Sequence, residues 1–189
     1  MPNLYIIAGC NGAGKTTTSY TVLPEMLNCK EFVNADEIAR GLSPFQPETV
    51  SFQAGRIMLN RIRELLREKK EFGFETTLST RSYVPLIKHA KKHGYIIVLI
   101  YFWLESVELA KARVKTRVEK GGHNIPNTII ERRYKRGLQN FFTLFKELAD
   151  SWMVYDNSHE LPVIITKGNA NLVSYIYNDD LWKKFHLSK

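Results

Sequence analysis

A glycine-rich loop ending in lysine and threonine follows the first apolar segment of the chain. The loop runs from Gly9 to Thr16 with the sequence GCNGAGKT, and the β-prone residues 4–8 precede it. The spacing G-x-x-x-x-G-K-T between a strand and a helix is typical of a phosphate-binding loop, or P-loop, whose backbone N–H groups surround phosphate oxygens. The loop therefore predicts an α/β fold that binds a nucleoside triphosphate beside its first strand.

The chemistry of the loop residues predicts what each one does. The Lys15 ammonium can reach the β- and γ-phosphates and take part in catalysis, and the Thr16 hydroxyl can be a ligand for Mg²⁺. The other predicted nucleotide-binding positions of the loop are Gly9, Asn11, Gly12, Ala13, Gly14 and Thr17. ATP or GTP together with Mg²⁺ are the expected cofactors.

Strand-like and helical segments alternate along the rest of the chain. Strands are predicted at 4–8, 32–35, 72–75, 95–102 and 152–155, with a possible sixth at 162–166, and helices at 15–27, 47–70, 82–93, 105–119, 126–149 and 169–186. Such alternation indicates a mostly parallel sheet with helices packed on it. We predict a single domain over residues 1–189: a P-loop NTPase/kinase-type three-layer sandwich with a five- or six-stranded sheet and a helical lid.

The composition and the apolar runs argue against a membrane or secreted protein. The 189 residues are 44% hydrophobic and 24% charged, which is ordinary for a globular domain. The longest apolar run, 95–104, is far shorter than the ~20 residues of a membrane span. A P-loop that starts at residue 9 leaves no room for a signal peptide, and Cys10 and Cys29 are not expected to pair. We expect a cytoplasmic protein.

One segment carries most of the net charge of +8. Nine basic and two acidic residues lie between Lys111 and Arg136, on either side of the turn GGHNIP at 121–126. Guanidinium groups that fold onto the γ-phosphate would stabilise its charge during transfer, so we interpret 111–136 as a lid. Binding of nucleic acid is the alternative, but the charge is not spread along a groove with interleaved aromatic residues. His123 in the turn is expected to shape the turn or contact substrate rather than bind a metal.

Two carboxylates are placed where predicted strands end. Ligands gather at the carboxyl ends of parallel strands, which puts Asp36 and Glu75 at the rim of the P-loop. Asp36 is interpreted as the acceptor of a proton from a substrate hydroxyl or as an aid to Mg²⁺ binding, and the alternative is an N-cap for a helical turn starting at Glu37. Glu75 is interpreted either as an acid in the Walker B position or as a group that binds a substrate hydroxyl.

Short hydroxyl side chains follow Glu75, and an Asx/Ser-rich loop follows the fifth strand. Thr76, Thr77, Ser79 and Thr80 can hydrogen-bond a polar substrate, although Ser79 and Thr80 can equally cap a helix starting near Arg81. The loop YDNS at 155–158, which includes Asn157, can either enclose the adenine or form a simple turn.

Several blocks over residues 3–158 resemble the zeta-toxin-like P-loop kinases. These blocks are GCNGAGKT at 9–16, NAD at 34–36 with Ile38 and Arg40, FETTLS at 74–79, RV at 117–118, GGHNIP at 121–126, RRYKR at 132–136 and YDNS at 155–158. The resemblance implies transfer of a phosphoryl group from ATP or GTP to a sugar hydroxyl of a UDP-N-acetyl sugar. It implies that Asp36 activates this hydroxyl and that Lys15 and lid arginines stabilise the transferred group.

The resemblance also implies which residues contact the substrates. We expect Arg117 and Arg133 to be the catalytic arginines, and Arg132 and Arg136 are the alternatives. The expected substrate contacts are Asp36, Arg40, Glu75, Thr76, Thr77, Arg81, His123, Arg132 and Arg136. The expected partner is a small-molecule acceptor; whether an antitoxin protein binds the chain stays open.

Two other functions compete with a small-molecule kinase. An ATP-driven switch or ABC-type ATPase would need a signature such as LSGGQ and a hydrophobic run ending in a Walker B aspartate, and the sequence has neither. A nucleic-acid end kinase is suggested by the basic charge but not by its concentration in one segment.

Overall fold

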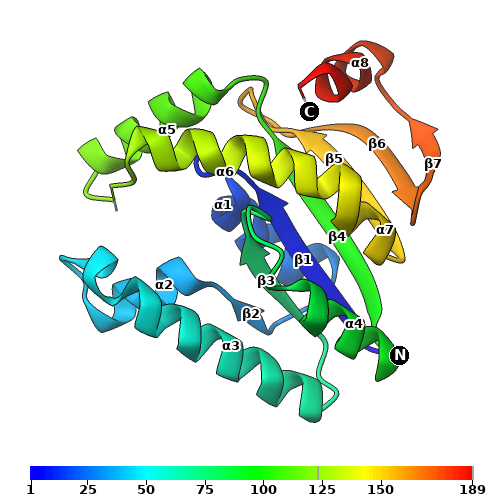
Figure 1. Cartoon of the computed structure of the whole chain (residues 1–189), viewed down its shortest axis with the longest axis horizontal. Helices are drawn as coiled ribbons and strands as arrows, with labels where there is room; N and C mark the ends of the chain where they lie inside the picture. The colour runs from blue at the N-terminus through cyan, green and yellow to red at the C-terminus, as the bar shows by residue number, and fades with distance from the viewer. Residues whose placement is uncertain (123, 189) are drawn as a thin grey trace.

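The computed structural model describes residues 1–122 and 124–188, and it confirms the predicted α/β class. Seven strands form one sheet in the order β2-β3-β1-β4-β5-β6-β7 (Figure 1). The strands from β2 to β5 are parallel, and β6 and β7 are antiparallel to their neighbours. The sheet is therefore mostly parallel, as expected of a P-loop kinase-type fold.

The strands and helices occupy the following ranges. The strands are β1 (Asn3–Gly9), β2 (Phe32–Val33), β3 (Phe72–Thr76), β4 (Ile96–Trp103), β5 (Ser151–Asp156), β6 (Val163–Asn169) and β7 (Leu172–Ile176). The helices are α1 (Lys15–Thr21), α2 (Ala35–Leu42), α3 (Ser51–Arg67), α4 (Val84–Lys92), α5 (Val107–Glu119), α6 (Asn127–Asn140), α7 (Lys146–Leu148) and α8 (Asp179–Leu187). Short helical turns are η1 (Val22–Met26), η2 (Pro47–Val50) and η3 (Phe141–Phe145).

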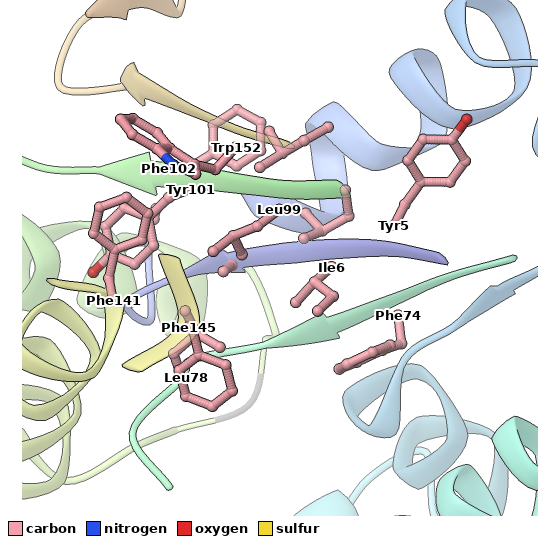
Figure 2. Close-up of a cluster of buried hydrophobic side chains, with 14 of the residues drawn as sticks. Tyr5, Ile6, Phe74, Leu78, Leu99, Tyr101, Phe102, Phe141, Phe145 and Trp152 are labelled. Carbon is pink, nitrogen blue, oxygen red and sulfur yellow. The ribbon is translucent and has the colours of Figure 1, made fainter. Parts of the chain in front are cut away.

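Strand β4, with the sequence IIVLIYFW, is apolar along its whole length, as expected of a strand in a parallel sheet that helices cover on both faces. Alternate side chains of β1 point to opposite faces of the sheet. On one face Tyr5 lies opposite Gly73, where the absence of a side chain lets Leu23 of η1 pack close. On the other face Tyr101, whose register partner is Ala8, contacts the Phe141 ring at a centroid distance of 4.8 Å. Figure 2 shows this second cluster, with Phe141 and Phe145 beneath the sheet.

The order of the strands places the P-loop at the point where the chain changes direction across the sheet. From β1 the chain passes over β3 to reach β2, and it later returns to β4 on the other side of β1. The loop after β1 therefore opens between the carboxyl ends of β3 and β4, where open α/β sheets bind their ligands. In Figure 1, α2 and α3 lie on one side of this point, and α5 and α6 lie on the other.

The C-terminal part corrects our prediction of five or six strands and of a helix at 169–186. Residues 172–176 form β7, the seventh strand, which pairs with β6 through a tight turn in which Ala170 adopts a left-handed conformation (φ 46°). The helix starts only at Asp179, where the Asn178 side chain accepts a hydrogen bond from the Leu181 N–H. The β-branched and aromatic residues of LVSYI favour a strand, which agrees with the formation of β7 in place of the first part of the predicted helix.

Three further helical segments differ from the prediction. The predicted helix 15–27 stops at Thr21 and continues as a wide turn, in which the Leu27 N–H bonds to the Val22 carbonyl. The predicted helix 126–149 is interrupted in the same way at 141–145. Helix α2 at 35–42 was not among the predicted helices, although a helical turn starting at Glu37 was considered as an alternative.

No helix in the described part of the chain is both long enough and apolar enough to pass through a bilayer.

Both thiols lie in the apolar interior, which predicts a loss of stability at alkaline pH. Burial raises the pKa of the Cys10 thiol from its ordinary 9.0 to about 11, and burial also raises the pKa of Cys29 to about 11. Above pH 9 the unfolded chain releases thiol protons that the folded chain keeps, so the free energy of unfolding falls as the pH rises through this window. The loss is at most about 3 kcal/mol per thiol.

Urea denaturation at pH 8 and pH 11 measures this effect. A Cys10→Ala/Cys29→Ala double variant is the control and should lose less stability between the two pH values than the native protein. Equal losses in the two proteins would contradict the prediction.

Candidate active site

The P-loop has the geometry that its sequence predicts. Gly12 and Gly14 have positive φ angles of 80° and 75°, which turn the chain around before α1 starts at Lys15. The Lys15 ammonium donates to the Cys10 carbonyl at 2.9 Å and is almost fully buried. Gly9 and Ala13 pack beneath the loop, and a side chain at Gly9 would collide with the Phe102 carbonyl of β4. The loop is therefore held between β1, β4 and α1.

Glu75, the penultimate residue of β3, contacts the P-loop directly. The Thr16 hydroxyl donates to Glu75 Oε2 at 2.7 Å, and Lys15 Nζ lies 3.4 Å from Glu75 Oε1. Of our two interpretations of Glu75, this geometry favours the Walker B position beside Thr16, the predicted metal ligand. A substrate contact by Glu75 stays a prediction.

Asp36 lies in the first turn of α2, and the helix is capped by a different residue from the one we considered. The Asn34 side-chain oxygen accepts hydrogen bonds from the N–H groups of Asp36 and Glu37, at 2.8 and 3.4 Å. The alternative that Asp36 is an N-cap is therefore wrong, because Asn34 has that role. The Asp36 side chain is exposed and lines two neighbouring cavities.

The first of these cavities, which we call the P-loop cavity, has a volume of about 580 Å³. The P-loop residues that line it are Asn11, Gly12, Gly14, Lys15, Thr16 and Thr17. Arg40 lines it from α2, and Arg113 and Arg117 line it from α5. Arg40 also forms an ion pair with Glu37 at 3.3 Å. This arrangement of loop amides and cations suits the phosphates of a nucleotide.

The second cavity, the hydroxyl-lined cavity, has a volume of about 220 Å³ and lies beyond the end of β3. Its hydroxyl-bearing residues are Thr76, Thr77, Ser79, Thr80 and Tyr83. Leu78 between them is buried in a left-handed conformation (φ 53°), which holds its neighbours toward the cavity. The Asn140 side chain of α6 bonds to the Leu78 carbonyl at 2.7 Å and holds this loop in place. Helix α4 begins only at Val84, so the predicted helix start near Arg81 is wrong.

The two cavities meet at four residues. Asn11, Lys15, Asp36 and Glu75 line both of them. A group held in the hydroxyl-lined cavity would therefore face a phosphate chain held in the P-loop cavity across the Asp36 carboxylate.

Arg133 reaches this boundary from α6. Its guanidinium donates to the Asn11 side chain at 3.2 Å and lines the hydroxyl-lined cavity. Desolvation lowers the pKa of Arg133, while the negative charge of Asp36 opposes this change. An arginine is protonated at any physiological pH, so Arg133 brings a partly desolvated positive charge to the boundary.

The loop after β5 holds the P-loop in place. The Asn157 side chain is buried and donates to the Ala13 carbonyl at 2.7 Å. The Arg113 guanidinium donates to the carbonyls of Asn157 and Ser158 at 2.6 and 2.9 Å. These contacts favour the second interpretation of 155–158, a structural turn. A nucleotide contact by Asn157 stays a prediction.

The basic segment is only partly directed at the cavities. Lys111 and Lys135 both pair with Glu131, which joins α5 to α6. Arg81, Arg132 and Arg136 are exposed, and they line neither of the two cavities, so their substrate roles also stay predictions. His123 lies outside the described residues. Within residues 1–122 and 124–188 no group of three His, Cys, Asp or Glu side chains could hold a metal ion.

Three residues that the structure places in the site were not among the site residues predicted from the sequence. Asn34 bonds to Thr16 and Glu75 as well as capping α2, Tyr83 lines the hydroxyl-lined cavity, and Arg113 clamps the loop after β5. An Asn three residues before Glu37 is an N-cap signal that could have revealed α2. Arg113 and Tyr83 carry no comparable local signal.

The chain is similar in sequence to known proteins. The sequence pattern of the zeta toxin family matches residues 1–168. An uncharacterised protein of Haemophilus influenzae is 32% identical over 127 residues, which cover 67% of this chain and 88% of that protein.

Two solved structures share the fold. The crystal structure of AvrRxo1-ORF1:-ORF2 with ATP matches with a TM-score of 0.72 at 18% identity, over 98% of this chain and 63% of the matched chain. A structure from the PezAT chromosomal toxin–antitoxin system of Streptococcus pneumoniae matches with a TM-score of 0.66 at 13% identity, over 100% of this chain and 84% of the other. This chain thus spans less than two thirds of the AvrRxo1 chain it matches.

Proposed function

The chain belongs to the zeta toxin family, and from its site we propose that it is a kinase that transfers the γ-phosphoryl group of ATP or GTP to a hydroxyl of a small molecule. The meeting of the two cavities at Asp36 and Lys15 carries this proposal. A nucleotide in the P-loop cavity would present its terminal phosphate to a hydroxyl in the hydroxyl-lined cavity, with a carboxylate at the boundary.

The residues at the boundary account for each part of the transfer. The acceptor oxygen forms a bond to the γ-phosphorus while the bond between that phosphorus and the β–γ bridging oxygen breaks, and the nucleoside diphosphate leaves. The hydroxyl proton passes to the Asp36 carboxylate. Lys15 and Arg133 stabilise the negative charge of the transferred group.

The donor set beside the P-loop fits Mg²⁺ bound together with the nucleotide. The Thr16 hydroxyl donates a hydrogen bond to Glu75 and accepts a long one from Asn34 at 3.4 Å, so its oxygen keeps a lone pair for a metal ion. Mg²⁺, when bound, neutralises charge on the β- and γ-phosphates. Thr16 would hold it, with the Glu75 carboxylate close by.

The lining of the hydroxyl-lined cavity supports a polar, uncharged acceptor group such as a sugar ring. Four Thr/Ser side chains supply donors and acceptors, while Arg133 is already bonded to Asn11. This lining, together with the family, supports a UDP-N-acetyl sugar as the acceptor. An antitoxin partner is supported only by the toxin–antitoxin system from which the PezAT structure comes.

Incubation of the protein with γ-labelled ATP or GTP, Mg²⁺ and a panel of acceptors tests the proposal. The panel contains UDP-N-acetyl sugars, free sugars, nucleosides and short oligonucleotides, with a sample lacking acceptor as the control. Label on a sugar hydroxyl is expected. Label on oligonucleotide ends would favour a nucleic-acid end kinase, and phosphate release that is equally fast without acceptor would indicate an ATPase.

A further inference from the structure

Asn34 makes more contacts within the site than its place at a helix start requires. It lies between β2 and α2 and is 6% exposed. Its Oδ1 accepts from the Asp36 N–H at 2.8 Å and from the Glu37 N–H at 3.4 Å. Its Nδ2 donates to Glu75 Oε2 at 2.9 Å and lies 3.4 Å from the Thr16 hydroxyl oxygen. One side chain thus joins the start of α2, the end of β3 and the P-loop.

The chemistry of these neighbours requires an amide at this position. The backbone N–H groups of α2 can only donate, so they must meet an oxygen. The Glu75 Oε2 atom accepts hydrogen bonds from its neighbours, so the group facing it must be a donor. Asparagine supplies an acceptor and a donor on one short, rigid group, whereas aspartate lacks the donor and serine lacks the reach.

The contacts of Asn34 connect the two halves of the proposed reaction. Its oxygen holds the backbone of the turn that carries Asp36, the proposed proton acceptor. Its nitrogen holds Glu75, which accepts a hydrogen bond from the hydroxyl of the proposed Mg²⁺ ligand, Thr16. We propose that Asn34 is a positioning residue that sets the Asp36 carboxylate relative to the Thr16 hydroxyl. This inference rests on the proposed kinase function and assigns a new residue to its site.

Two substitutions separate capping from bridging. Asn34→Ser keeps an N-cap hydroxyl three residues before Glu37, the pattern of a capping box, but is too short to reach Glu75. Asn34→Ala removes both contacts. Asn178 is the matched control, because its side chain caps α8 by accepting a hydrogen bond from the Leu181 N–H. It is far from the P-loop along the chain, and it lies at the edge of the sheet that β7 forms. Asn178→Ser and Asn178→Ala therefore repeat the capping changes alone.

We expect Asn34→Ser to lower kcat by about 10- to 100-fold, as is typical of residues that orient a metal ligand, without a change in KM for the acceptor. We also expect it to reduce, by about tenfold, the gain in ATP affinity that Mg²⁺ produces in calorimetric titration. The Asn178 variants should change neither quantity. A double variant Asn34→Ser/Glu75→Gln should be no worse than the worse single variant, because the contact is already lost.

Thermal unfolding of all variants separates positioning from simple stability. An Asn34→Ser protein with native kcat and a native response to Mg²⁺ would overturn the inference. So would a loss of kcat no larger than the unfolded fraction explains. If the native protein labels no acceptor at all, the proposed function fails, while the Mg²⁺-dependent affinity for ATP still decides the role of Asn34.

Discussion

Asp36→Asn is expected to lower phosphoryl transfer by about 10²- to 10⁴-fold, the usual contribution of a general base. The asparagine amide has nearly the shape of the carboxylate but cannot take the proton from the hydroxyl of the acceptor substrate. Nucleotide affinity should stay nearly the same, because in our proposal the P-loop amides and Lys15, and not Asp36, hold the phosphates. Transfer of label to the acceptor and calorimetric titration with ATP measure the two quantities separately.

Asp180→Asn is the matched control for this substitution. Asp180 and Asp36 are each the second residue after a capping asparagine, Asn178 and Asn34, but Asp180 lies in α8 and outside both cavities. The control should transfer phosphate at the native rate. An Asp36→Asn protein that loses ATP binding but keeps its transfer rate would show that Asp36 does not accept the proton.

Arg133→Ala is expected to lower kcat by about 10³- to 10⁵-fold, the range found for arginines that stabilise the transferred phosphoryl group. The hydrogen bond to Asn11 holds the guanidinium at the boundary of the two cavities. Little free energy is therefore needed to orient its charge during the reaction. Arg133→Lys should recover only part of the activity, because an ammonium cannot repeat the planar fork of the guanidinium. Single-turnover transfer of label is the measurement.

Arg136→Ala provides the comparison on the same helix. Arg136 is exposed and lines neither cavity, so its removal should leave kcat nearly unchanged. If Arg136→Ala or Arg132→Ala is the more damaging change, the catalytic arginine has been assigned to the wrong position of α6.

The features that sequence alone predicted well depend on short stretches of chain. The P-loop is specified by its own glycines, lysine and threonine, and the adjoining strand and helix are local as well. The apolar run 95–102 was predicted as a strand, and it became β4 between β1 and β5. The missing helix α2 and the missing strand β7 had local signals too, namely the Asn34 cap and the LVSYI run, but both elements are short and each signal is weak.

The roles of particular side chains could not be predicted in the same way. The sequence did not predict that the Asn157 side chain bonds to the Ala13 carbonyl, 144 residues away along the chain, and its predicted nucleotide contact stays a prediction. Five of the nine basic residues between Lys111 and Arg136 either pair with Glu131, face the cavities or clamp a loop, and a charge count cannot distinguish these uses.

The sequence by itself determined that the chain forms an α/β sheet with a phosphate-binding loop and carries carboxylates where strands end, because these properties follow from neighbouring residues. Only the tertiary structure decided that Asp36, Glu75, Asn34 and Arg133 meet at one boundary. They come from α2, β3, the turn before α2, and α6, and the order of the strands brings these elements together. The physical reason is that hydrogen bonds and charges act over a few ångströms of space, whatever the separation along the chain.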